Sequence, residues 1–185
     1  MIAGHLELRL LQLINILKID GGYMIVIGYQ GIGKSTVSNK SKGFIDLESG
    51  NFFHYGNRPT DWYIYYCQIA EHLSQQGYVV FVSSHEPVRN WFIRSSERAI
   101  IICPDLNLET EWIDKLNKRY NATHKEKDYK AWQNTVYRFK ENIKELFDCG
   151  IPVISINTMT YDLEKMIRTV INKNSEIDMH CRQIY

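Results

Sequence analysis

Five short, continuous runs of apolar residues divide this chain of 185 residues and limit the folds that it can adopt. The runs are YMIVIGY at 23–29, GFIDL at 43–47, YVVFVSS at 78–84, AIIICP at 99–104 and PVISI at 152–156. Runs that are continuous rather than strictly alternating are typical of strands buried on both faces, as in a parallel sheet. We therefore expect five parallel strands.

Helical patterns fill the gaps between these runs. One begins near Thr60, stops at Gly77 and places Trp62, Tyr65, Tyr66, Ile69, Ala70 and Leu73 on one face. A longer pattern covers 125–148, with an apolar stripe of Tyr129, Trp132, Val136, Phe139, Ile143, Leu146 and Phe147. A last helix is expected over about 161–173. Alternating strands and helices predict an α/β fold with right-handed crossovers.

Composition and charge limit the domain organisation and the partners. With 44% hydrophobic residues, the length suits one compact domain, placed at 24–174, preceded by an apolar helical extension at 1–23 and followed by a polar tail at 175–185. A net charge of +1 gives no basic excess for nucleic-acid binding, although a local patch stays open. No run reaches the roughly 18–20 apolar residues of a membrane span. The four cysteines form no CxxC pair and suggest free thiols in the cytoplasm.

The segment GYQGIGKS, residues 28–35, matches the phosphate-binding motif G-x-x-x-x-G-K-[ST], the Walker A motif or P-loop. It follows an apolar strand, and KSTVSNK can open a helix, which is the context that the motif requires. Backbone N–H groups of such a loop surround phosphate oxygens, the lysine bridges the β- and γ-phosphates, and the hydroxyl ligates Mg²⁺. The expected ATP-binding residues are Gly28, Gly31, Gly33, Lys34, Ser35 and Thr36.

A motor-type ATPase usually carries a second acid at the end of an apolar strand. Here the run at 78–84 ends in Ser83 and Ser84, and Asp105 comes one residue after the run at 99–104. The missing acid and the short chain argue against a motor or a helicase.

With these motifs, residues 24–170 resemble the P-loop nucleotide and nucleoside kinase family, particularly small kinase-like proteins of bacteriophages. The resemblance implies a three-layer fold, with helices on both faces of a five-stranded parallel sheet of order 2-3-1-4-5, and a lid at about 106–130. Acids at the exit of the second strand, Asp46 and Glu48, would position the acceptor or Mg²⁺, with Asp46 and Ser35 at the metal. Arg119 looks like a lid arginine that stabilises transferring charge.

The resemblance also implies an acceptor site. Arg89, after the third strand, would grip an acceptor phosphate, and His85 would hydrogen-bond the acceptor, while Phe53, Tyr55 and Arg58 would close over its base. The expected activity is phosphoryl transfer from Mg-ATP to a nucleotide, first of all a (deoxy)nucleoside monophosphate. A nucleoside, a modified base in DNA, or an ATP-binding switch or NTPase without kinase activity remain alternatives, and a homodimer is left open.

Overall fold

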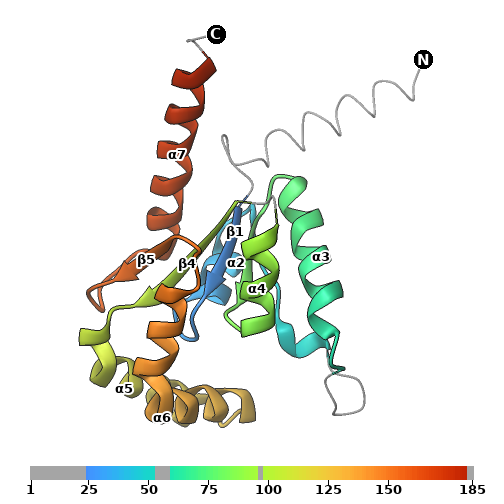
Figure 1. Ribbon diagram of the computed structural model, residues 1–185. Coiled ribbons are helices and arrows are strands. Elements are labelled where there is room, and N and C mark those ends of the chain that lie inside the picture. Colours follow the sequence, from blue (N-terminus) through green and yellow to red (C-terminus); the bar gives the residue numbers. More distant parts are fainter. Residues whose placement is uncertain (1–23, 53–58, 96–97, 183–185) are drawn as a thin grey trace, which may run out of the picture.

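A computed structural model describes residues 24–52, 59–95 and 98–182 of the chain (Figure 1). Its centre is one all-parallel sheet with the strand order β2-β3-β1-β4-β5. The strands are β1 (Met24–Gly28), β2 (Phe44–Asp46), β3 (Val79–Ser83), β4 (Ala99–Pro104) and β5 (Val153–Ile156). The five predicted strands and their parallel arrangement are confirmed, and the order agrees with the one that the resemblance implies.

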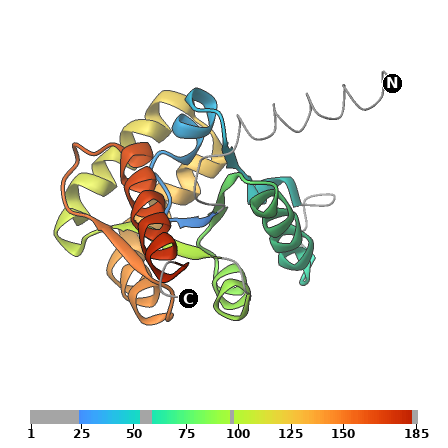
Figure 2. The ribbon, with the colours of Figure 1, turned by 90° about the horizontal axis from the view of Figure 1, so that it is seen from above.

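Six helices and two 3-10 turns connect the strands in the described part of the chain. They are α2 (Lys34–Lys40), η1 (Ser49–Phe52), α3 (Trp62–Gln75), α4 (Glu86–Arg94), η2 (Leu106–Leu108), α5 (Glu109–Thr123), α6 (Glu126–Asp148) and α7 (Leu163–Arg182). Seen from above, α2 and α7 lie on one side of the sheet, and α3 and α4 lie on the other (Figure 2). Helices thus cover both faces of the sheet. This explains why apolar and polar residues do not alternate along the strands.

The strand β1 occupies the middle of the sheet, and all five of its residues are buried. In the parallel register Gly28, the last residue of β1, lies beside Ser83 of β3 and Ile102 of β4. The carboxyl ends of the strands therefore meet where the P-loop begins. In open α/β sheets this edge is the usual place for ligands.

The helix α3 buries only part of the predicted face, because Trp62, Tyr66 and Ala70 are buried as expected but other members are not. Tyr65 is 66% exposed and Ile69 is 42% exposed, whereas Cys67 and Ser74 are fully buried beside Tyr66. Packing against the sheet thus rotates the buried face away from Tyr65 and Ile69 and towards Cys67 and Ser74.

The helix α6 is interrupted at Arg138, whose backbone angles (φ −135°, ψ 19°) are not helical. After this break the predicted stripe is correct for Phe139, Ile143 and Leu146, which are buried, but wrong for Phe147, which is 48% exposed. Before the break it is wrong, because Val136 is 40% exposed. The interruption rotates the first half of α6, which buries Asp128 and Thr135 instead. This first half approaches the P-loop.

The ends of the chain were predicted to be a helical extension and a polar tail. The extension, residues 1–23, lies outside the described residues. The last helix continues well beyond the predicted end near 173, since α7 reaches Arg182. None of the helices described is long and apolar enough to cross a membrane.

Candidate phosphate-binding and phosphoryl-transfer site

The P-loop connects β1 to α2, and three glycines determine its shape. Gly31 and Gly33 have positive φ angles of 86° and 100°, which side chains with a Cβ rarely adopt. A Cβ on Gly28 would come within 2.6 Å of Ile32 Cδ1 and 2.8 Å of Lys34 Cδ. The turn therefore favours glycine at positions 31 and 33, and a side chain at position 28 would force Ile32 and Lys34 to shift.

The Lys34 side chain folds back over the loop. Its Nζ donates to the carbonyl oxygens of Gly28 at 2.7 Å and Tyr29 at 3.3 Å. Burial lowers the pKa of Lys34 to about 8, Asp46 and Glu48 act in the opposite direction, and Arg119 lowers the pKa further. These three residues are thus near enough to Lys34 to influence its charge. Each of the three other predicted catalytic residues therefore acts electrostatically on Lys34.

Ser35 and Asp46 come together across 11 residues of sequence. The Ser35 hydroxyl donates to Asp46 Oδ2 at 2.5 Å. Asp46 is the last residue of β2, so the sheet fixes its position beside the P-loop. A hydroxyl and a carboxylate at this distance are hard oxygen donors of the kind that Mg²⁺ prefers. The donor set therefore fits the predicted magnesium site. Thr36 is exposed in the first turn of α2, where its N–H bonds the Gly33 carbonyl.

Glu48 follows Asp46 at the exit of β2 and forms an ion pair with Lys127 of α6, with 3.3 Å between Nζ and Oε2. Partial burial alone would raise the pKa of Glu48, but Lys127, the N–H of Gly50 and Lys34 together lower it below its ordinary value. Glu48 is thus held ionised, and its pair with Lys127 links the start of α6 to the β2 exit.

Arg119 lies near the end of α5, within the predicted lid segment, 106–130. Its Nη2 forms an ion pair with Asp128 Oδ1 of α6 at 3.0 Å. The beginning of the same segment belongs to the core, since Trp112 and Leu116 of α5 are fully buried. The arginine is therefore carried by a helix anchored in the core of the domain.

Two aromatic side chains hold the P-loop from outside. Trp112 Nε1 donates to the carbonyl of Gln30 at 2.9 Å, and the Tyr161 hydroxyl donates to the carbonyl of Ile32 at 2.9 Å. The Lys115 ammonium contacts both rings, 4.3 Å from the Trp112 centroid and 5.0 Å from that of Tyr161. Both bonds engage backbone carbonyls of the loop and so restrict its conformation.

The Gln30 side chain adds a third connection, to α6. Its Nε2 donates to the carbonyl of Ala131 at 2.8 Å and to Thr135 Oγ1 at 2.5 Å. The P-loop is thus tied to α5, α6 and the segment after β5. Sequence reasoning missed these contacts, because each joins residues more than 80 positions apart and the motif leaves its third position, Gln30, unspecified.

The residues at the acceptor side are only partly described. Phe53, Tyr55 and Arg58 lie outside the described residues. Tyr66 connects the exits of β2 and β3, because its hydroxyl donates to the carbonyl of Leu47 and accepts from the N–H of Ser83, both at 2.8 Å. His85 immediately precedes α4, is exposed, and packs its ring edge to face against Trp62. This pair joins the start of α3 to the start of α4.

Arg89, the predicted anchor for an acceptor phosphate, already has two partners. Its side chain is 10% exposed and donates from Nη1 to the Ser84 carbonyl at 2.6 Å and from Nη2 to Glu145 at 3.0 Å. These bonds connect α4 and the β3 exit to α6. As placed, the guanidinium is engaged in holding the fold together.

No acidic residue lies at the end of β3, where motor-type ATPases usually carry their second acid. The strand ends at Ser83, whose hydroxyl is buried without a hydrogen-bond partner among the described residues. Asp105, after β4, caps η2 through the N–H of Asn107 and accepts from the Ser155 hydroxyl. Asp46, from β2, is the carboxylate that contacts the P-loop serine.

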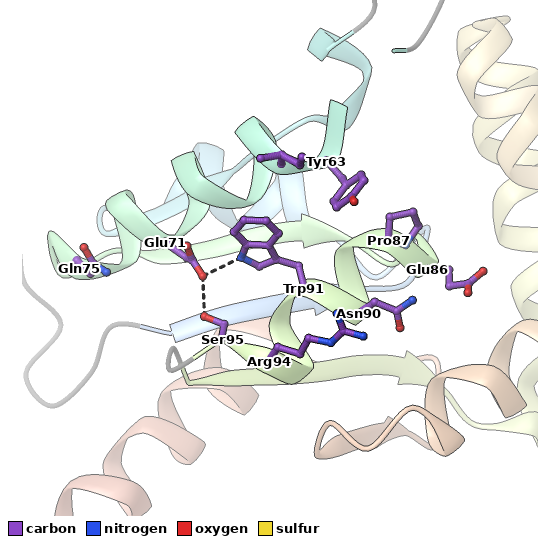
Figure 3. Close-up of a pocket in the computed structure, with 10 residues that line it drawn as sticks. Tyr63, Glu71, Gln75, Glu86, Pro87, Asn90, Trp91, Arg94 and Ser95 are labelled. Atoms are coloured by element: carbon purple, nitrogen blue, oxygen red, sulfur yellow. Dashed lines mark hydrogen bonds between the residues drawn. The ribbon is translucent and has the colours of Figure 1, made fainter. Parts of the chain in front are cut away.

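A separate groove of about 890 Å³ lies between α3 and α4 (Figure 3). Tyr63, Pro87 and Trp91 line it together with Glu71, which accepts from Trp91 Nε1 at 2.8 Å and Ser95 Oγ at 2.6 Å. Arg94 also lines it, at the end of α4 away from the P-loop. None of the P-loop residues borders this groove, so it is distinct from the phosphate site.

Comparison with known proteins adds nothing to the geometry. A scan against models of protein families finds no match to the chain, and a search of curated proteins finds no match either. What the site does is therefore inferred from the residues that form it.

Proposed function

We propose that this chain transfers the γ-phosphoryl group of Mg-ATP to a small nucleotide or nucleoside. The observation that carries the proposal is the contact of Asp46 with Ser35 of the P-loop, beside Lys34, whose charge is also influenced by Arg119. Phosphoryl transfer needs little covalent chemistry from the protein. It needs positioning and charge stabilisation, which these side chains can supply.

Each side chain has a defined task in this proposal. Lys34 exchanges its bonds to Gly28 and Tyr29 for β- and γ-phosphate oxygens. Ser35 and Asp46 would hold Mg²⁺, which when bound neutralises charge on the phosphates. Arg119 approaches from α5 and stabilises the charge that develops on the transferring group. Glu48 stays ionised beside Lys127, where it helps to orient an acceptor.

The engaged state of Arg89 supports an alcohol as a further candidate acceptor. A monophosphate needs a cation to hold its phosphate, and Arg89 already pairs with Glu145 and the Ser84 carbonyl. An alcohol instead needs a base, and Asp46 is an ionisable group at the site. A nucleoside or similar alcohol is therefore the second candidate beside the expected monophosphate.

The experiment is ADP formation from Mg-ATP by the purified chain. It is measured without acceptor, with pooled nucleoside and deoxynucleoside monophosphates, and with pooled nucleosides, with Lys34→Ala as the control for contaminating activity. Stimulation by one pool, absent in Lys34→Ala, supports the kinase and identifies its acceptor class. ATP binding without ADP formation in any pool would contradict small-molecule kinase activity and favour an ATP-binding switch.

Asp46→Asn distinguishes the two acceptor classes. It keeps the shape of the side chain but removes the base, so phosphorylation of an alcohol should fall by about 10²- to 10⁴-fold. Transfer to a monophosphate, already ionised, should fall less. The measurement is kcat with each pool at saturating Mg²⁺, which compensates for weaker metal binding. Equal kcat in the variant and the wild-type chain would exclude Asp46 as a base.

A further inference from the structure

Asp128, in the first turn of α6, is a carboxylate that the fold removes from solvent. Its residue is 5% exposed, among the few charged or polar residues buried in the described part of the chain. Burial of a carboxylate is costly unless hydrogen bonds and opposite charge compensate for it. The partners that compensate Asp128 therefore indicate why the fold retains it.

Both side-chain partners of Asp128 come from the last turns of α5. Arg119 Nη2 lies 3.0 Å from Oδ1, and the Thr123 hydroxyl donates to Oδ2 at 2.6 Å. The chain reverses between α5 and α6 at His124. This residue adopts a left-handed conformation with φ 51°, and its N–H donates to the carbonyl of Tyr120. The tight reversal brings the start of α6 back against Arg119.

The same turn of α6 is fixed on the side of the phosphate site. Lys127, the neighbour of Asp128, pairs with Glu48 at the β2 exit. The charge of Arg119 also acts on Lys34 in the P-loop. Asp128 is thus placed between the helix that carries the arginine and the strand exit that carries the predicted acids.

The Arg119 guanidinium has donors to spare. One donor is directed to Asp128, while the buried Nε has no hydrogen-bond partner among the described residues. A guanidinium has five N–H donors in a planar fork, so fixing one edge restricts the directions of the others.

We propose that Asp128 is a positioning residue, which holds one edge of the Arg119 guanidinium so that its remaining donors face the phosphoryl group in the P-loop. This role rests on the proposed kinase function and adds to it a residue that does not touch the substrate. An arginine held in place before the reaction can stabilise the transition state without moving. It therefore avoids the free-energy cost of reorganisation during the reaction.

The test is a double-mutant cycle with Arg119→Ala, Asp128→Asn and the double variant. We expect Asp128→Asn to lower kcat by about 10- to 100-fold, as small misplacements of catalytic groups do, with KM for ATP nearly unchanged. Because Asp128 acts through Arg119, the double variant should be no slower than Arg119→Ala alone. Glu126→Gln is the matched control, because its carboxylate is two residues away on α6 but pairs with Lys130 in solvent.

A second readout does not require turnover. The affinity for Mg·ADP·aluminium fluoride, which mimics the transferring group, should fall in Asp128→Asn while the affinity for Mg·ADP stays the same. Equal loss of both affinities, or kcat losses that add in the double variant, would make Asp128 merely structural and overturn the inference. If only this inference fails, the wild-type chain still forms ADP with an acceptor. Absence of that activity overturns the proposed function, and with it this role.

Discussion

At the scale of single residues, Lys34 connects protonation to nucleotide binding. Burial lowers its pKa to about 8, so the free protein loses this proton as the pH rises through about 8. Bound phosphate favours the charged form. Above pH 8 binding must therefore take up a proton, and Kd for Mg-ATP should increase by up to about tenfold per pH unit.

Calorimetric titrations between pH 7 and 9 measure this dependence. Lys34→Arg is the control, because a guanidinium stays charged throughout this range and should give a flat profile. A wild-type profile as flat as that of Lys34→Arg would mean that the lysine is not partly deprotonated in the free protein.

Gly31 is a second residue with a prediction of its own. Gly31→Ala places a Cβ at φ 86° and 2.9 Å from Leu116 Cδ2, so it should lower the free energy of unfolding by more than the roughly 1–2 kcal/mol of backbone strain. Gly150→Ala is the matched control, because Gly150 has the same φ and nothing within 4 Å of the added Cβ. Thermal unfolding of both variants gives the comparison. Equal losses would show that the contact with Leu116 carries no cost.

At the scale of elements, the P-loop depends on the helices packed behind it. Trp112→Phe keeps an aromatic ring in α5 but removes the indole N–H that binds the Gln30 carbonyl. One hydrogen bond is worth about 0.5–1.5 kcal/mol, so Kd for ATP should increase by roughly 2- to 10-fold.

Trp91→Phe is the control for this variant. It removes an equivalent bond, to Glu71, in the groove between α3 and α4, which lies apart from the P-loop. Both variants should lose stability in thermal unfolding, but only Trp112→Phe should bind ATP more weakly. Weaker binding in both variants would mean that the effect is general destabilisation.

The strands and helices differ in how well the sequence predicts them. The strands were predictable because burial on both faces leaves continuous apolar runs, as in residues 24–28. The face of α3 was not, because Tyr65 and Ile69 are apolar and yet exposed. Hydrophobic periodicity ranks the faces of an isolated helix, whereas packing against the sheet selects among them. The interruption of α6 at Arg138 was likewise not predictable, because the sequence of α6 contains no glycine or proline.

At the scale of the whole molecule, the parallel sheet assembles the site by bringing strand exits to one edge. Asp46 from β2 contacts Ser35 of the P-loop there, so the closeness of the loop and the acid could be predicted from a motif and from strand position. Asp128 and Tyr161 could not, because their roles depend on how α5, α6 and the β5 exit pack around the loop. Such contacts between distant segments follow no local pattern.

The most direct test of this account is equilibrium binding of ATP, with and without Mg²⁺, to the full chain and to the Lys34→Ala and Ser35→Ala variants. We predict that the wild-type chain binds ATP and that Mg²⁺ tightens the binding. Lys34→Ala should weaken it by at least about tenfold, as expected for the loss of a charged hydrogen bond of roughly 1.5–3 kcal/mol. Ser35→Ala should reduce mainly the effect of Mg²⁺. Binding of ATP by Lys34→Ala as tight as that of the wild-type chain would contradict the account, because the nucleotide would then not occupy the P-loop.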